Sequence, residues 1–245
     1  MPALAASALM QARRRVAFGR VLLLTNGWLP TVVLPGLEVV DAGPLQHPAE
    51  VADFVVRRLH AHVTTSHALL LHWDAGVLDA GAWTDEFLVH DLVAAPDDAP
   101  AGRGLPALSL RSRRLLRAGA DPRLGEGLLD DAALCGRHRA FLEDAHGVSF
   151  APEALGRRFA AGADRGRAGT FGFAGVAHLP AQRDEAEMIE IARRLPGEFL
   201  AGGEAALLHE ALLSRGMRAA ADWLGQCRTA EQGRHAALRA AQAPP

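Results

Sequence analysis

Residues 67 to 77 read HALLLHWDAGV, an apolar run that ends abruptly at Trp73 and Asp74. A run without polar alternation, followed by a carboxylate and Gly76, predicts a parallel strand buried on both faces. Asp74 would then lie at the carboxyl end of that strand, where open α/β sheets bind their ligands, and it could hold a metal ion or a sugar hydroxyl. The alternative is that Asp74 caps the following turn, since Asp is a common turn former.

The composition is that of an ordinary globular protein. Of 245 residues, 49% are hydrophobic and 22% charged, and the net charge of -2 argues against a nucleic-acid-binding surface. Cys135 and Cys227 show no metal-binding spacing, so neither a disulfide framework nor a zinc site is indicated and a reduced, cytoplasmic setting is expected. No apolar run approaches the roughly 18 to 20 residues of a transmembrane segment. The basic cluster Arg13 to Arg15 follows the apolar part of the amino end, the reverse of a secretory signal, and indicates a surface helix.

Apolar strands alternate with helices along the first part of the chain. Strands are expected at 20–25 and 37–41, a helix begins at Pro48, and it leads into the His67 strand. This alternation predicts an α/β fold with a mixed, mainly parallel sheet flanked by helices. His60, His62, His67 and His72 lie close together in sequence, but their spacing does not favour a shared metal site.

The remaining segments are shorter. The sequence predicts a helical or turn segment at 82–88, followed by strands at 90–96 and 107–110 on either side of a loop at 97–104. A basic helix at 111–119 and a helix at 128–147, with Gly147 as its stop, come next. The domain ends with a strand stub at 148–152, a helix at 152–160, a loop at 160–169 and an aromatic turn from Thr170. From residue 183 onward two to four helices are expected, and their apolar stripes should pack on the domain. We therefore expect an α/β domain over 1–180 and a helical extension over 181–245.

Several of these segments together carry a resemblance. In chain order they read HWDAGV, WTDEFL, HDLVAAP, LPALSLRS, DDAALC, FAPEALGRRF and FGFAG. They resemble a bacterial family of glycosyltransferase-like domains of unknown function. In that family the motifs are Gln-Trp-Asp-Gly-Phe, Trp-x-Asp-Glu-Phe-Leu, Tyr-Asp-Tyr-Ile-Gly-Ala-Pro, Asn-Gly-Gly-Phe-Ser-Leu-Arg-Ser, Glu-Asp, Phe-Ala-Pro and Phe-Gly-Phe-His-Gly. The resemblance covers about residues 1 to 180 and is specific in combination.

The resemblance implies a glycosyltransferase-A-like, Rossmann-like fold that binds a nucleotide-sugar donor and a glycan acceptor. Asp74 would correspond to the metal-binding carboxylate, for Mn²⁺ or Mg²⁺, and Asp131 to the catalytic base that orients the acceptor. A divalent cation on a diphosphate needs hard oxygen ligands, and an acceptor hydroxyl needs a carboxylate within hydrogen-bond reach. The substrate-binding residues would be Trp73, Asp130, Arg111, Ser112, Phe173 and Gly175. From spacing alone, Asp130 and Asp131 could instead simply favour the start of their helix.

The chain also departs from the family pattern. Asn-Gly-Gly becomes Leu105-Pro106-Ala107, the final His becomes Ala174, and the strand expected before the amino-terminal helix is absent. Either the true start lies farther upstream or part of the donor site has been lost. Two hypotheses remain: a metal-dependent glycosyltransferase, possibly in surface polysaccharide synthesis, or a catalytically degenerate relative that serves as a binding or scaffold module, with the helical tail as its partner surface.

Overall fold

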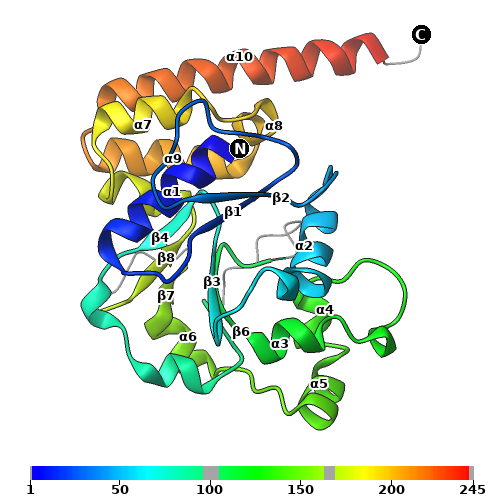
Figure 1. Cartoon of the computed structure of the whole chain (residues 1–245). Coiled ribbons are helices and arrows are strands. Elements are labelled where there is room, and N and C mark those ends of the chain that lie inside the picture. Colours follow the sequence, from blue (N-terminus) through cyan, green and yellow to red (C-terminus); the bar gives the residue numbers. More distant parts are fainter. Residues whose placement is uncertain (1, 96–104, 163–168, 243–245) are drawn as a thin grey trace. The chain divides into compact units, whose positions relative to one another are not determined.

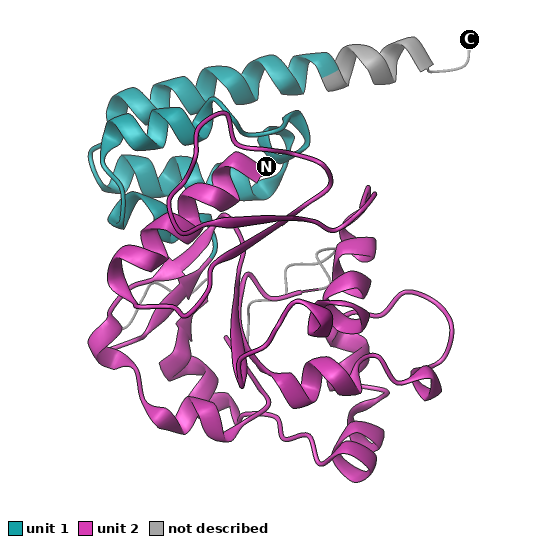
Figure 2. Cartoon of the chain, viewed as in Figure 1, with its two compact units in different colours: residues 1, 175–245 teal, residues 2–174 magenta. Residues whose placement is uncertain are grey.

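The computed structural model describes residues 2–95, 105–162 and 169–242, with side chains up to residue 234. The chain forms two compact units, residues 2–174 and residues 175–245 (Figure 2). Each unit is described by itself. The loop predicted at 97–104 and most of the loop predicted at 160–169 lie outside the described residues.

The amino-terminal segments form as expected. Helix α1 (Pro2–Arg15) buries small apolar side chains and ends in its three arginines. Strands β1 (Leu22–Thr25) and β2 (Glu38–Asp41) pair in parallel, and α2 (Pro48–Arg57) begins with proline in its first turn. The capping box of α2 is closed by Glu50, whose carboxylate accepts the backbone N–H of His47.

The central sheet corrects the prediction of a mainly parallel arrangement. Strands β3 (His67–Leu71), β6 (Leu108–Ser112) and β5 (Leu92–Ala94) lie in the order β3-β6-β5, and both pairs are antiparallel. Strands β3 and β6 are labelled in Figure 1. A parallel connection needs a crossover of a dozen or more residues, usually a helix. β3 and β5 run in the same direction on either side of β6, which runs against both. Between β3 and β5 the chain forms a short strand and two short 3-10 helices, η2 (Ala80–Ala82) and η3 (Asp85–Val89), instead of the long crossover helix of a parallel sheet.

The fully buried strand is β6, not β3. All five residues of β3 are half-buried, because β3 lies at an edge of this sheet, whereas all five residues of β6 are buried at its centre. The unbroken apolar run therefore predicted a strand correctly, but β3 is half-buried instead of fully buried. A half-buried edge strand and a buried central strand can share the same apolar pattern.

A second sheet joins the region after β3 to the FGFAG segment. Strand β4 (Ala75–Val77) pairs antiparallel with β8 (Gly172–Ala174), which pairs in parallel with β7 (Ala160–Ala161). The turn predicted from Thr170 is thus a strand. Its glycines permit close packing: a Cβ at Gly172 would lie 2.3 Å from Leu108 Cδ2, and one at Gly76 would lie 2.7 Å from Phe173 Cε1.

The helix predicted at 128–147 is broken in two. Helix α4 (Asp131–Cys135) ends at Gly136, whose backbone leaves the helical region, and α5 (Arg139–His146) ends at Gly147 in the left-handed conformation, as predicted. Helices α3 (Arg113–Ala118) and α6 (Glu153–Phe159) form near their predicted bounds. Short 3-10 helices, η1 (Leu59–Ala61) and η4 (Pro122–Leu124), complete the connections. The strand stub is a single bridge between Leu92 and Phe150.

The central sheet is packed on both faces. Leu69, Leu71, Val93 and Leu110 contribute to a core with α1, α6 and the second sheet, which contains the rings of Phe87, Phe159 and Phe171. Ala68 and Leu70 lie on the other face, against a cluster that includes residues of α2 and α3, and Leu92 belongs to a cluster with residues of α3, α4 and α5. The alternation of side chains along each strand therefore divides the unit into layers.

The second unit is helical, as predicted for the tail. It contains η5 (Val176–Ala181), α7 (Glu185–Ala192), α8 (Gly197–Ala201), α9 (Gly203–Ser214) and α10 (Arg218–Gln242). Met188, Ile191, Leu208 and Leu212 are buried, and α10 packs on α7, α8 and α9. In the described part of the chain, no helix is both long enough and apolar enough to span a bilayer.

Candidate functional site

An ion pair between Arg111 and Asp131 is buried beside the central strand. Arg111 has no exposed surface, and its Nη2 lies 2.5 Å from Asp131 Oδ2. The guanidinium Nε also donates to Ser109 Oγ at 3.1 Å. Two charges removed from water need close contact and full hydrogen bonding, because the desolvation cost of each amounts to several kcal/mol.

The local sequence explains how these groups meet. Ser109 and Arg111 are two positions apart on β6 and therefore point to the same face of the sheet. Asp130 is the N-cap of α4, where its Oδ1 accepts the backbone N–H of Ala133 at 2.8 Å. This cap fixes Asp131 as the first helical residue, turned toward Arg111. Asp130 thus takes the capping role that spacing alone allowed, and Asp131 is held by a specific partner.

The second oxygen of Asp131 is different. Oδ1 is buried and has no hydrogen-bond partner among the residues that the structure describes. A buried acceptor left unsatisfied costs about 1 to 3 kcal/mol, so such an atom calls for an explanation, for example a bound water or ligand. Chemically, this oxygen can accept a hydrogen bond or a proton from a hydroxyl group.

Cys135 lies one turn after Asp131 on α4. Although the residue as a whole is exposed, the pKa of its thiol is raised to about 11, mainly by desolvation and secondly by the Asp131 carboxylate. The two effects act in the same direction, since both disfavour the thiolate. The pKa of the Cys135 thiol therefore depends on the charge of the Asp131 carboxylate.

Ser112 belongs to a different cluster, centred on Asp91. Its hydroxyl donates to Asp91 Oδ1 and accepts the backbone N–H of Leu115 at 3.0 Å, which caps α3. Asp91 Oδ2 accepts the backbone N–H of Ser149 at 2.8 Å. As adjacent residues on β6, Ser112 and Arg111 point to opposite faces. The sequence analysis did not single out Asp91, although a carboxylate directly before an apolar strand was a signal for it.

Trp73 and Asp74 lie between β3 and β4, and both are buried, Asp74 completely. The backbone N–H of Ala75 donates to His72 O, which forms a tight turn at this point. The contacts of Arg111 and Asp131 within the described ranges do not include Asp74. A cleft shared by Asp74, Arg111 and Asp131 stays a prediction.

The predicted residues of the FGFAG segment lie along β8. Phe173 pairs with Gly76 and packs its ring against it, and Ala174 pairs with Ala75 directly after Asp74. Gly175 follows with a φ of 102°, at the start of η5. Ala174, which replaces the family's histidine, is part of the hydrophobic core.

The Leu105-Pro106-Ala107 segment is also part of the core. All three residues are buried, and Leu105 packs with Val55 and Leu116. The backbone O of Ala107 accepts the N–H of His72 at 2.8 Å. Where the resembling family has glycines, this chain has Pro106 and Ala107, and both are buried.

For metal binding, the described residues contain no group of three or more His, Cys, Asp or Glu side chains. Mg²⁺ in nucleotide sites is commonly held by one or two carboxylates, with phosphate oxygens and water completing its shell. The oxygen chemistry of Asp74 fits that donor type.

Comparisons with known proteins add no relative: no protein-family model, no curated protein and no solved structure matches the chain.

Proposed function

We propose that the unit over residues 2–174 is a glycosyltransferase-like domain that moves a sugar from a nucleotide-sugar donor to an acceptor hydroxyl, with Asp131 as the base. The observation that carries the proposal is the asymmetry of the Asp131 carboxylate. Oδ2 is held by Arg111 and Oδ1, within the described residues, is buried without a partner. A hydroxyl group of a substrate supplies the donor that Oδ1 lacks.

Arg111 acts as a positioning residue in this proposal. It is fully buried, and its contacts are with Asp131 and Ser109, so its role is to orient the carboxylate rather than to bind phosphate. By holding Oδ2, the guanidinium fixes the orientation of the carboxylate and directs Oδ1 toward the acceptor. Oδ1 then takes the proton of the acceptor oxygen as that oxygen attacks the sugar carbon.

Asp74 is the proposed carboxylate on the donor side. A divalent cation, Mn²⁺ or Mg²⁺, would supply Lewis-acid stabilisation of the departing diphosphate. Asp74 would provide one oxygen ligand to that ion. Trp73 and Phe173 flank this region in sequence and sheet register, and the family resemblance assigns them to substrate binding.

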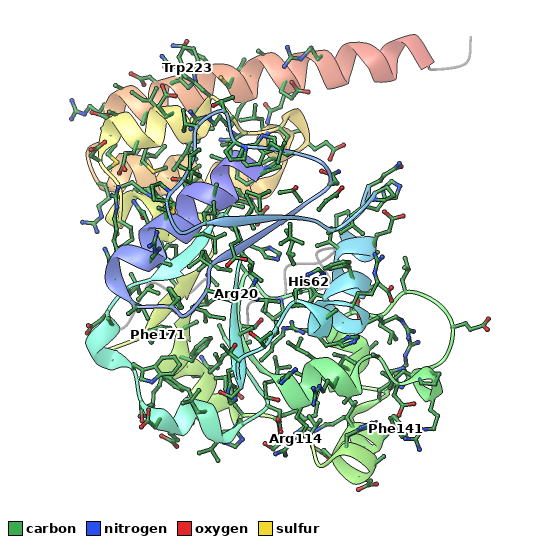
Figure 3. The ribbon with its side chains drawn as sticks, viewed as in Figure 1. Arg20, His62, Arg114, Phe141, Phe171 and Trp223 are labelled. Carbon is green, nitrogen blue, oxygen red and sulfur yellow. The ribbon has the colours of Figure 1, made fainter. Side chains whose placement is uncertain are left out.

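The convergence of the resembling segments supports the proposal. Phe87 of WTDEFL, Phe159 of FAPEALGRRF and Phe171 of FGFAG meet in one aromatic core. The ring centroids are 5.2 Å apart for Phe87 and Phe159 and 5.7 Å apart for Phe159 and Phe171. Phe171 is labelled in Figure 3. The LSLRS strand lies at the centre of the main sheet. Segments far apart in sequence therefore build one structural unit, as a shared ancestry of the motifs would require.

A specific observation favours the second candidate, a degenerate binding or scaffold module. Ala107 and Ala174 occupy positions where the family has glycine and histidine, and both are core residues here. Side chains that fill the core leave those positions unable to serve a ligand. Ala174→His would moreover overpack the core, so restoring the family residue is not a clean test.

The test is the release of nucleoside diphosphate from a panel of nucleotide sugars, with Mn²⁺ or Mg²⁺ and simple glycan acceptors, together with calorimetric titration of nucleoside diphosphates. Asp131→Asn should lower turnover by about 10²-fold or more and leave diphosphate binding unchanged. Asp74→Asn should remove the metal-dependent part of binding. Asp144→Asn, on an exposed carboxylate of α5, is the matched control and should behave as wild type.

No binding and no turnover by the wild-type chain on any donor would overturn the proposal in favour of the scaffold module. Unchanged turnover in folded Asp131→Asn would remove Asp131 from the mechanism.

A further inference from the structure

The connection between β1 and β2 presents large apolar side chains to solvent. Leu29, Val32 and Val33 are 72%, 66% and 89% exposed, which places them among the most exposed large hydrophobic residues that the structure describes. A single exposed apolar residue is ordinary on a protein surface. Three within five residues form a concentrated apolar tip, and such patches commonly mark an interaction site.

The loop is anchored at both ends. Gly27 and Gly36 adopt positive φ values of 84° and 75°, and Pro30 and Pro35 restrict the backbone between and beside the tip residues. Thr25 Oγ1 donates to Trp28 O at 3.1 Å, and Leu37 N donates to Leu34 O at 3.0 Å. The chain therefore holds the apolar tip away from its own core instead of folding it inward.

Charge along the chain is unevenly distributed around this loop. The first 37 residues contain four arginines and no Asp or Glu, so they carry +4, while the rest of the chain carries -6 to give the net charge of -2. Charge asymmetry of this kind points to an anionic partner.

The arginines lie beside the loop itself. The side chain of Arg13, at the end of α1, donates through Nη1 to Pro35 O, a carbonyl that leaves its charge uncancelled. Arg14 is exposed next to it. Arg20, labelled in Figure 3, lies at the base of β1 and pairs with Glu38 at 2.6 Å, so its charge is largely neutralised.

We propose that the tip residues Leu29, Val32 and Val33, with Arg13 and Arg14, form a docking surface for an anionic phospholipid bilayer. Apolar side chains enter the boundary between headgroups and acyl chains, while arginines bind the phosphates above them. Charge complementarity favours this partner over two others. A neutral protein surface would not pair with the arginines, and a nucleic acid would not bury the aliphatic side chains of the tip. The inference does not rest on the proposed glycosyl transfer.

The experiment is flotation of the full chain with phospholipid vesicles, either purely zwitterionic or half anionic. The wild-type chain should float with the anionic vesicles, and rising salt should weaken the binding. Val32→Asp with Val33→Asp should reduce the partition coefficient on the order of a hundredfold, from the apolar area lost and the charge added. Arg13→Gln with Arg14→Gln should reduce it by roughly tenfold or more.

The matched control is Leu88→Asp with Val89→Asp, which changes another exposed apolar pair of the same unit, 41% and 71% exposed. It should leave vesicle binding unchanged, and all three variants should keep the wild-type unfolding midpoint. Fluorescence of Trp28, assigned with a Trp28→Phe variant, should shift to the blue on anionic vesicles.

Three results would overturn the proposal: no binding to anionic vesicles, an equal loss in the control variant, or binding of a DNA duplex that depends on the arginines but not on the tip. Self-association abolished by the tip variants, without vesicle binding, would identify a protein interface instead.

Discussion

Two carboxylates, Asp91 and Asp131, are buried beside the same central strand and are held in different ways. Asp91 accepts the hydroxyl of Ser112 on one oxygen and the backbone N–H of Ser149 on the other. Asp131 has Arg111 on one oxygen, while the other, within the described residues, has no hydrogen-bond partner. Asp91 ties together β6, α3 and the segment after α5, so every contact has a structural use. The Arg111–Asp131 pair buries two charges, and it leaves Asp131 Oδ1 without a donor among the described residues.

Burial by itself therefore does not identify a functional carboxylate. The contacts of Asp91 indicate a structural role, because its loss would leave the half-buried N–H of Ser149 without its acceptor. An ion pair with a spare oxygen stabilises a fold poorly compared with apolar residues of similar volume. The difference supports the proposed role of Asp131, and four changes test it.

The largest effect is expected from Asp131→Ala. It leaves the guanidinium of Arg111 in a fully buried position without its counter-charge. Breaking a buried pair on one side typically costs about 3 to 5 kcal/mol, so the free energy of unfolding should fall by that amount. Denaturant titration measures it, and a loss under about 1 kcal/mol would mean that the pair is not desolvated.

Asp91→Ala should cost somewhat less, about 2 to 3 kcal/mol. It leaves the Ser149 N–H and the Ser112 hydroxyl without their acceptor, while the nearby Arg114, with a side chain 60% exposed, turns to water. The same titration applies. Because this cluster has no role in the proposed chemistry, any variant of it that folds should keep wild-type turnover.

A smaller effect concerns the thiol of Cys135. Desolvation and the Asp131 charge raise its pKa to about 11, so Asp131→Asn should lower the thiol pKa by removing the second cause. Alkylation of Cys135 in a Cys227→Ser background should therefore begin at lower pH in the variant than in the parent. An identical pH profile would show that Asp131 does not act on the thiol as a charge.

Ser149→Ala should change least, by about 0.5 kcal/mol. It removes a hydroxyl that lies 3.3 Å from Asp91 Oδ2 but keeps the shorter bond from the backbone N–H. A loss of unfolding free energy close to that of Asp91→Ala would show that the Ser149 hydroxyl, rather than its backbone N–H, supplies most of the stabilisation.

Much of the secondary structure followed from the sequence. Pro48 started α2, Gly147 ended α5, and the strands predicted at 20–25 and 107–110 formed as β1 (Leu22–Thr25) and β6 (Leu108–Ser112). Strand direction did not follow, because an apolar run carries no information on which neighbour it pairs with. The break at Gly136 was missed since the apolar pattern continues across it, and β8 was read as a turn because its glycines serve close packing.

The site was predictable only in part. Asp131 and Arg111 were named from a family resemblance, and the structure brings these two together. Their partner Ser109 follows from the alternation of side chains on β6, a step that needs the strand's exact position. Ser112 was assigned with Arg111 from the same family motif, and in the structure its hydroxyl contacts Asp91 and caps α3. The surroundings of Asp74 depend on contacts far apart in the chain.

The most direct test of the account is the stability and turnover of a double variant, Arg111→Met with Asp131→Leu. Replacing a buried ion pair by apolar residues of similar volume is often neutral or stabilising by about 1 to 4 kcal/mol. We predict an unfolding free energy equal to or above that of the wild type, together with loss of nucleoside diphosphate release. A double variant that is about 3 kcal/mol less stable, or one that is stable and turns over nucleotide sugars as the wild type does, would contradict a functional role for the pair.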